Sequence, residues 1–211
     1  MSTIAIIGGT GYTGSNLARE ATGRGHTVVS WSGHEPKDPV NGVRYETGDA
    51  ADATKIIDGA EVLIAALSPR GDLAGRVARL YETYAAAAAR AGVTFIVIGG
   101  FSSLRPAVGQ PRFTETDLPE QFRDEALEME AFRDWIMTQA PTGLDWVFIS
   151  PAGGYGGFAP GEKTGTYRIG GDVALFTEDG KSELSGPDFA QAVLDVIESG
   201  EHRGEHISVA Y

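Results

Sequence analysis

The fold is decided near the start of the chain, by the stretch Ile4-Ala5-Ile6-Ile7-Gly8-Gly9-Thr10-Gly11-Tyr12-Thr13-Gly14. The apolar residues 4–7 are typical of a strand that is buried on both faces, and the chain after Gly14 continues as a helix. Gly8 permits a tight turn out of the strand, Gly11 lets a pyrophosphate approach the backbone, and Gly14 lets the helix pack closely on the strand. A buried strand, a glycine turn and a helix in this order predict a dinucleotide-binding site, with the pyrophosphate at the positive end of the helix.

Two other phosphate-binding loops match these glycines poorly. A P-loop is excluded because no Gly-Lys-Ser/Thr sequence follows the turn. A kinase glycine loop is disfavoured because a helix, rather than a second strand, follows. The alternative that stays open is a glycine-rich turn without a ligand.

The rest of the chain alternates between strand and helix patterns. Buried strands are predicted at residues 27–31, 43–47, 62–67, 94–98 and 145–149, with short ones near residues 167–169, 174–176 and 206–209. Helices are predicted over residues 53–57, around the apolar positions 73–88 and 122–140, and after the capping sequence Ser185-Gly186-Pro187-Asp188. This order predicts an α/β fold with a Rossmann-like, doubly wound parallel sheet. We expect a single domain over residues 1–211, to which residues 151–211 contribute loops on the substrate side.

Composition excludes several classes of protein. With 42% hydrophobic and 22% charged residues in 211, the chain has the make-up of an ordinary globular protein. No apolar run reaches the length of a membrane span, and the first predicted strand begins too early for a signal peptide, so we expect a cytoplasmic protein. The net charge of −12 would repel a nucleic-acid backbone. There is no cysteine, and the four histidines are scattered, so we expect no metal site; His202 and His206 are interpreted as part of a solvated turn.

Ligands of doubly wound sheets bind outside the carboxyl ends of the strands. After the second predicted strand, Ser32, His34 and Lys37 offer contacts for the 2′-phosphate of NADP, whereas Glu35 could hold the ribose hydroxyls of NAD. No acidic residue stands at the strand end itself, which favours NADPH and leaves NAD open. The alternative for His34 and Lys37 is ordinary polarity of an exposed loop.

Two further strand ends offer contacts to the adenosine half of the cofactor. After the third predicted strand, Asp49 could accept a hydrogen bond from the adenine amino group, with Ala50 beside it, or it could cap the next helix. Leu67 and Ser68 follow the fourth predicted strand, where the riboses would lie.

Several motifs beyond the glycine turn make nearly the whole chain resemble one group of proteins. They are Arg24-Gly25-His26, Gly48-Asp49-Ala50, Gly99-Gly100-Phe101-Ser102-Ser103-Leu104, Asp145-Trp146-Val147-Phe148-Ile149-Ser150-Pro151-Ala152 and Gly161-Glu162-Lys163-Thr164-Gly165-Thr166-Tyr167-Arg168. The chain resembles the atypical short-chain dehydrogenase/reductase group, in particular NmrA-like NAD(P)H-binding proteins and relatives named NADH-flavin reductases or NAD-dependent epimerase/dehydratases. The resemblance implies that the cofactor is held by Gly8, Gly9, Thr10, Gly11, Tyr12, Thr13 and Gly14, and that Ser150, Pro151 and Ala152 border the nicotinamide. It also implies that Ser102 and Ser103 meet the substrate, as candidate catalytic residues.

One departure from the wider superfamily bears on the chemistry. Ordinary dehydrogenases and epimerases of this kind use a Tyr-x-x-x-Lys pair, in which the lysine lowers the pKa of the tyrosine so that it can exchange protons with substrate. No tyrosine here has a lysine four residues later, and residues 85–154 hold neither type. Sugar epimerase chemistry by the usual route is therefore disfavoured.

Three functions follow from these features. The first is an oxidoreductase that passes hydride from NAD(P)H to a flavin or quinone-like planar acceptor, which needs positioning more than a protein acid. Tyr155, Phe158 and Phe101 could stack on such an acceptor, or could be ordinary loop and core aromatics. The second is a non-catalytic, NmrA-like sensor that binds NADP(H) and regulates a protein partner. Independently of this choice, Ser102 and Ser103 could be a strand-end pair that only forms hydrogen bonds to the backbone or the cofactor. The third is an epimerase/dehydratase that uses other residues.

Overall fold

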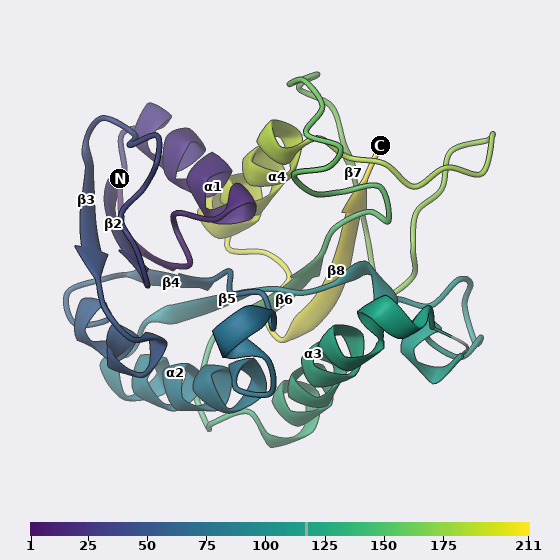
Figure 1. The fold of residues 1–211 in the computed structure, drawn as a ribbon, viewed down its shortest axis with the longest axis horizontal. Helices are drawn as coiled ribbons and strands as arrows, with labels where there is room; N and C mark the ends of the chain where they lie inside the picture. The colour runs from purple at the N-terminus through teal and green to yellow at the C-terminus, as the bar shows by residue number, and fades with distance from the viewer. Residues whose placement is uncertain (117) are drawn as a thin grey trace.

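An eight-stranded sheet runs through the middle of the molecule in the computed structural model, which describes residues 1–116 and 118–211 (Figure 1). The strand order is β3-β2-β1-β4-β5-β6-β8-β7, and every neighbouring pair is parallel except β7 and β8. The strands are β1 (Thr3–Ile7), β2 (Thr27–Ser32), β3 (Val43–Thr47), β4 (Val62–Ala65), β5 (Thr94–Ile98), β6 (Trp146–Ser150), β7 (Arg168–Gly170) and β8 (Glu205–Ala210). The predicted Rossmann-like, doubly wound α/β fold is confirmed.

Helices cover both faces of this sheet. Figure 1 shows α1 (Tyr12–Gly23) and α4 (Gly186–Ser199) on one face, and α2 (Val77–Ala91) and α3 (Glu120–Gln139) on the other. Successive side chains of a strand point to opposite faces, so Ile4 and Ile6 of β1 join the core under α1 and α4, whereas Ala5 and Ile7 join the core under α2 and α3. This double burial is why the strands are continuous apolar runs.

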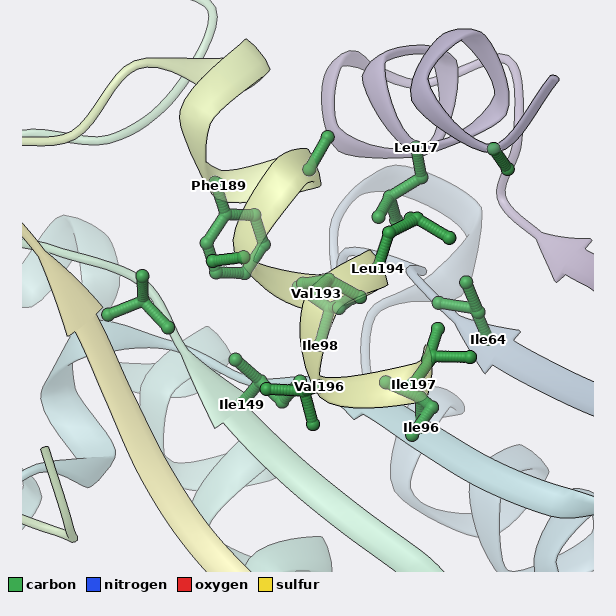
Figure 2. Packing of buried hydrophobic residues seen from close by; sticks show 14 of the residues in the cluster. Leu17, Ile64, Ile96, Ile98, Ile149, Phe189, Val193, Leu194, Val196 and Ile197 are labelled. Atoms are coloured by element: carbon green, nitrogen blue, oxygen red, sulfur yellow. The ribbon is translucent and has the colours of Figure 1, made fainter. Parts of the chain in front are cut away.

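The packing on the α1 and α4 face shows how the helices are held. In Figure 2, Phe189, Val193 and Val196 of α4 lie over Ile98 and Ile149 of the sheet, with Leu17 of α1 alongside. The residues of this cluster are almost completely buried. Burial of each large apolar side chain contributes about 1.5–3 kcal/mol, so this interface anchors α1, and with it the glycine turn.

The structure differs from the sequence prediction at several points. The predicted helix over residues 53–57 is a 3₁₀ helix over Ala50–Ile56, and Leu73 belongs to a separate turn before α2. No strand forms at residues 174–176; Val173 makes only an isolated bridge to Arg105. Phe122 is 48% exposed on α3, whereas Arg133 is buried.

The strand order reverses at β1, which has β2 on one side and β4 on the other. In a doubly wound sheet this reversal opens a crevice at the carboxyl ends of the two central strands, where ligands bind. The glycine turn leaves β1 at this point and leads directly into α1. No helix in the described ranges combines the length and apolarity needed to cross a bilayer.

Candidate functional site

A single elongated cavity of about 940 Å³ lies along the carboxyl edge of the sheet. It begins at the glycine turn, passes the ends of β2, β3 and β4, and continues beyond β5 and β6. Its lining is formed by residues 7–8, 10–13, 31–34, 48–50, 66–68, 70, 72–73, 76, 98–101, 125, 151–153 and 155–158. All the predicted cofactor residues line it except Gly9, Gly14 and Ser150, which is buried, and the role of the lining residues in binding stays a prediction.

The glycines of the turn are required by close backbone contacts. Gly8 has φ of +88°, and a Cβ there would lie 2.5 Å from the carbonyl oxygen of Ala66 on the neighbouring strand end. A Cβ on Gly14 would lie 2.2 Å from the carbonyl oxygen of Gly8. Gly9 and Gly14 therefore bring helix and strand together, while Gly8 and Gly11 face the cavity.

The start of α1 is suited to an anion. Its N-cap residue is Gly11, which offers no side chain to the free N–H groups of the first turn. By contrast, the N-cap residue of α4 is Ser185, whose hydroxyl accepts a hydrogen bond from the amide of Asp188. An uncapped helix start that opens onto a cavity fits the pyrophosphate of a dinucleotide, because N–H groups and the helix dipole both favour negative charge there.

The side chains after β2 lie beside the glycine turn. Ser32 Oγ accepts a hydrogen bond from the amide of Thr10 at 3.2 Å, and His34 Nδ1 lies 3.3 Å from Thr10 Oγ1. Both line the cavity, whereas Glu35 and Lys37 are not part of its lining. No carboxylate stands at the end of β2, so this corner offers hydroxyl and imidazole groups.

Asp49 has structural partners and faces the cavity as well. Its Oδ1 accepts a hydrogen bond from the amide of Ala51 at 2.8 Å, as the cap of the 3₁₀ helix, and lies 3.2 Å from Arg76 Nη2. The bond from Ala51 and the charge of Arg76 hold the pKa of this carboxyl below its usual value. The capping role and a contact to adenine are both compatible with this geometry.

Arg70 and Arg76, from the loop before α2, line the cavity, although neither was among the predicted site residues. Arg70 makes a two-pronged ion pair with Glu125 of α3, at 2.5 and 2.9 Å, and Glu128 accepts a hydrogen bond from the amide of Gly75. The feature of the sequence that could have indicated them is a pair of arginines beside glycines in the loop after β4.

The far end of the cavity is glycine-rich and aromatic. Phe101 stacks on Phe113, with ring centroids 4.8 Å apart, and the exposed ring of Phe158 lies on the opposite loop. Tyr155 Oη lies 2.9 Å from Thr13 Oγ1, and burial raises the pKa of this phenol. Tyr12 donates to the carbonyl of Pro160. The loop after β6 is therefore bonded to the start of α1.

The comparison with known proteins agrees with this geometry. A family model described as NAD(P)H-binding matches residues 8–200. The chain belongs to this NAD(P)H-binding family.

Several solved structures of similar proteins align with this chain over its full length. A “putative epimerase” from Bacteroides thetaiotaomicron is 29% identical at a TM-score of 0.86, covering 100% of this chain and 97% of that one. A “putative NADH-flavin reductase” from Streptococcus pneumoniae TIGR4 is 28% identical at 0.85, covering 100% and 99%. A “putative exported protein” from Burkholderia pseudomallei is 32% identical at 0.86, covering 100% of both chains. The predicted resemblance to NAD(P)H-binding relatives with flavin reductase and epimerase names is confirmed.

The two serines predicted to be catalytic lie outside the cavity lining of this NAD(P)H-binding protein. Ser102 and Ser103 follow β5 in a short 3₁₀ turn, and only Phe101 of that turn lines the cavity. Ser103 is 1% exposed, and its carbonyl accepts a hydrogen bond from Arg112. Their catalytic role stays a prediction that this geometry does not favour.

The interpretation of His206 as part of a solvated turn is wrong. It is the second residue of β8, is 5% exposed, and lies between Arg133 and Ser150. His202 does lie in a turn, paired with Glu205. The sequence signal for a buried His206 was its place inside a continuous strand, and the signal for Arg133 was its place in the apolar stripe of α3.

Proposed function

We propose that this protein is an NAD(P)H-dependent reductase of a flavin or a related planar acceptor. The observation that carries the proposal is one continuous cavity that runs from the uncapped start of α1 at one end to Phe101 after β5 at the other, with the glycine-rich loop after β6 in contact with both. The first end suits a pyrophosphate and the second suits a flat ring system. Hydride transfer needs both groups in one enclosure.

The tyrosines of the cavity are not arranged for proton transfer to a carbonyl or alcohol. Tyr12 and Tyr155 line the cavity, but their hydroxyls bond to Pro160 and Thr13. No lysine is present in the cavity lining of the described chain, so neither phenol has the cation that would lower its pKa. This supports a reaction without a tyrosine acid over sugar epimerisation by the usual route.

A flavin acceptor removes the need for a protein acid. A bound reduced nicotinamide supplies a hydride, which carries two electrons to the flavin ring, and solvent supplies the proton that completes the reduced flavin. The protein then contributes orientation, with Phe101 flanking the acceptor and Pro151 and Ala152 bordering the nicotinamide.

The end of β2 supports NADPH as the preferred donor. Ser32 and His34 provide groups that can donate hydrogen bonds to a 2′-phosphate, and no carboxylate faces the cavity there to hold a ribose diol. NADH would lack the partner for these groups, so we expect it to bind more weakly.

The experiment is a titration of the purified protein with NADPH and NADH, followed by oxidation of each with FMN, FAD, riboflavin and menadione. Turnover above the rate without protein supports the reductase, and the ratio of the two Kd values measures the cofactor preference. Binding without turnover on any acceptor would refute the reductase and favour an NADP(H) sensor. Absence of binding by either nucleotide would refute both.

A further inference from the structure

A buried polar cluster lies beneath the far end of the cavity. Its members are Arg112, Glu130, Arg133, Ser150 and His206. The two arginines, the serine and the histidine are each at most 7% exposed, although they come from a loop, α3, β6 and β8. Burial of charged groups costs free energy because they lose their hydration, so such groups are buried where they are paired with one another.

The protonation of His206 follows from its partners. Arg133 Nε donates to His206 Nδ1 at 3.2 Å, and a guanidinium has no acceptor, so Nδ1 must carry the lone pair. Burial, together with the positive charges of Arg133 and Arg112, lowers the pKa of His206 to about 3. The ring is therefore neutral near pH 7, with its single proton on Nε2.

This tautomer fixes the direction of the next two hydrogen bonds. His206 Nε2 lies 2.9 Å from Ser150 Oγ and donates to it. The hydroxyl of Ser150 then has one proton to give, and it gives it to the carbonyl of Gly100 at 2.9 Å. A serine that receives a proton from histidine cannot use that histidine as a base, so the pair is not a hydrolytic nucleophile.

Both ends of the turn after β5 are held by this cluster. Ser150 holds the carbonyl of Gly100, and Arg112 Nη1 donates to the carbonyl of Ser103 at 2.7 Å. Glu130 links the two branches, since its Oε1 lies 3.1 Å from Arg133 Nη1 and 3.5 Å from Arg112 Nε. Residues 99–101, at the start of this turn, line the cavity and face the loop after β6.

The ring of His206 supports the turn by packing as well. It meets the ring of Phe148 edge-on, with centroids 4.9 Å apart. Phe148 in turn lies directly under Gly99, where a Cβ would come within 2.0 Å of its ring. The polar contacts of His206 therefore reach Gly100 through Ser150, and its apolar contacts reach the neighbouring Gly99 through Phe148.

We propose that the chain Arg133–His206–Ser150 is a positioning device, which fixes the turn at residues 99–101 as the wall against which nicotinamide and acceptor are aligned. The inference rests on the proposed reductase function. His206 and Ser150 are positioning residues, since neither lines the cavity. Loss of either leaves the turn free to shift, which lowers the rate of hydride transfer while the distant glycine turn continues to hold the cofactor.

The test compares Ser150→Ala, His206→Phe, their double variant and the conservative His206→Gln. We expect each of the first two to bind NADPH within twofold of wild type, to lose about tenfold in kcat, and to lose the enhancement of nicotinamide fluorescence on binding. The double variant should be no slower than the slower single variant, because both substitutions interrupt the same series of hydrogen bonds. His206→Gln keeps a donor and should recover most of the rate.

The matched control is Ser208→Ala. Ser208 is paired with Ser150 across β6 and β8, is 1% exposed, and donates to the carbonyl of Val173 at 2.7 Å rather than to the turn. It should keep the wild-type kcat and fluorescence. An equal loss in this control would overturn the positioning role in favour of a general effect on the sheet.

The remaining outcomes separate this inference from the proposed function. Unchanged kcat and fluorescence in Ser150→Ala overturn the inference alone, and this variant decides the matter if His206→Phe does not fold. If the wild type binds NADPH without turnover, the reductase fails, and the fluorescence of the bound nicotinamide still tests the positioning. No NADPH binding by the wild type overturns both.

Discussion

At the glycine-turn end of the cavity, the surface that faces a ligand is mostly backbone. Gly8, Gly11 and Thr10 stand there, and the turn is closed by a main-chain hydrogen bond from the amide of Gly11 to the carbonyl of Gly8 at 3.1 Å. At the far end, the wall after β5 is instead held from below by buried side chains, among them Arg112 and His206.

The two constructions have opposite sensitivities. A site made of backbone in close contact is sensitive to any added atom, and protonation hardly affects it because few side chains take part. A wall held by buried polar groups is sensitive to the loss of one group and to a change in its charge. Variants at the two ends should therefore fail in different ways, and the following predictions compare them.

The largest effect is expected from Gly14→Ala. The added Cβ would lie 2.2 Å from the carbonyl oxygen of Gly8 and 2.5 Å from the Cα of Gly9, and neither backbone atom can move without shifting the strand. We expect a loss of about 3 kcal/mol in the free energy of unfolding, measured by urea denaturation, with loss of cofactor binding.

Gly23→Ala is the matched control in the same helix. A Cβ there meets no atom within 4 Å, and Gly23 has no positive φ. This variant should gain about 0.5–1 kcal/mol, because alanine loses less backbone entropy on folding. Equal stability of the two variants would mean that close packing of α1 on β1 does not hold the turn.

The same contrast explains how much could be predicted from the sequence. The glycine turn is contiguous, and each glycine has a local reason, so Gly8, Gly11 and Gly14 could be assigned from spacing alone. Ser32 follows because the end of β2 must lie beside the end of β1 in this fold.

The far end could not be assigned in this way because its groups are distant in sequence. His206 meets Ser150 only because β8 pairs with β6. These two strands are separated in the sequence by β7 and α4. Gly204 indicates a turn, and His206 stands at the very first position of the predicted strand, so the sequence pattern alone favoured a solvated turn over burial. Arg112 comes from a loop whose path no local pattern predicts.

The second prediction concerns the pH dependence of stability. The native pKa of His206 is lowered to about 3, below the 6.5 of an unperturbed histidine, so the unfolded chain takes up the proton first as the pH falls. Stability is therefore lost on acidification between those two values. The groups that face the ring are Arg133 from α3, and Arg112 and Asp172 from loops.

From pH 7 to pH 5 this single site should cost the wild type about 2 kcal/mol, as a free energy of unfolding. In His206→Gln, which cannot titrate there, the loss over the same range should be smaller by that amount. The carboxylates contribute equally to both proteins, so the difference between the two denaturation series isolates the histidine. Parallel pH profiles would show that His206 is not held neutral.

The third prediction concerns the acceptor. Phe101→Leu keeps an apolar side chain and removes the ring that stacks on Phe113, so we expect the acceptor KM to rise about fivefold with the NADPH Kd unchanged. Phe122→Leu, at an exposed position of α3 that does not line the cavity, is the control and should change neither constant. A rise in the NADPH Kd of Phe101→Leu would mean that the two ends of the cavity are not separable.

The smallest effect is expected at the end of β2, where a side chain adds to a site otherwise built from backbone. His34 is exposed and lines the cavity, so its contact with a 2′-phosphate would be weakened by water and salt. We expect His34→Ala to raise the Kd of NADPH about threefold at low salt and to leave that of NADH unchanged. Lys37→Ala, outside the cavity lining, should leave both unchanged. Equal weakening of both nucleotides would instead assign His34 to its 3.3 Å contact with Thr10, as a support of the glycine turn rather than a partner of the phosphate.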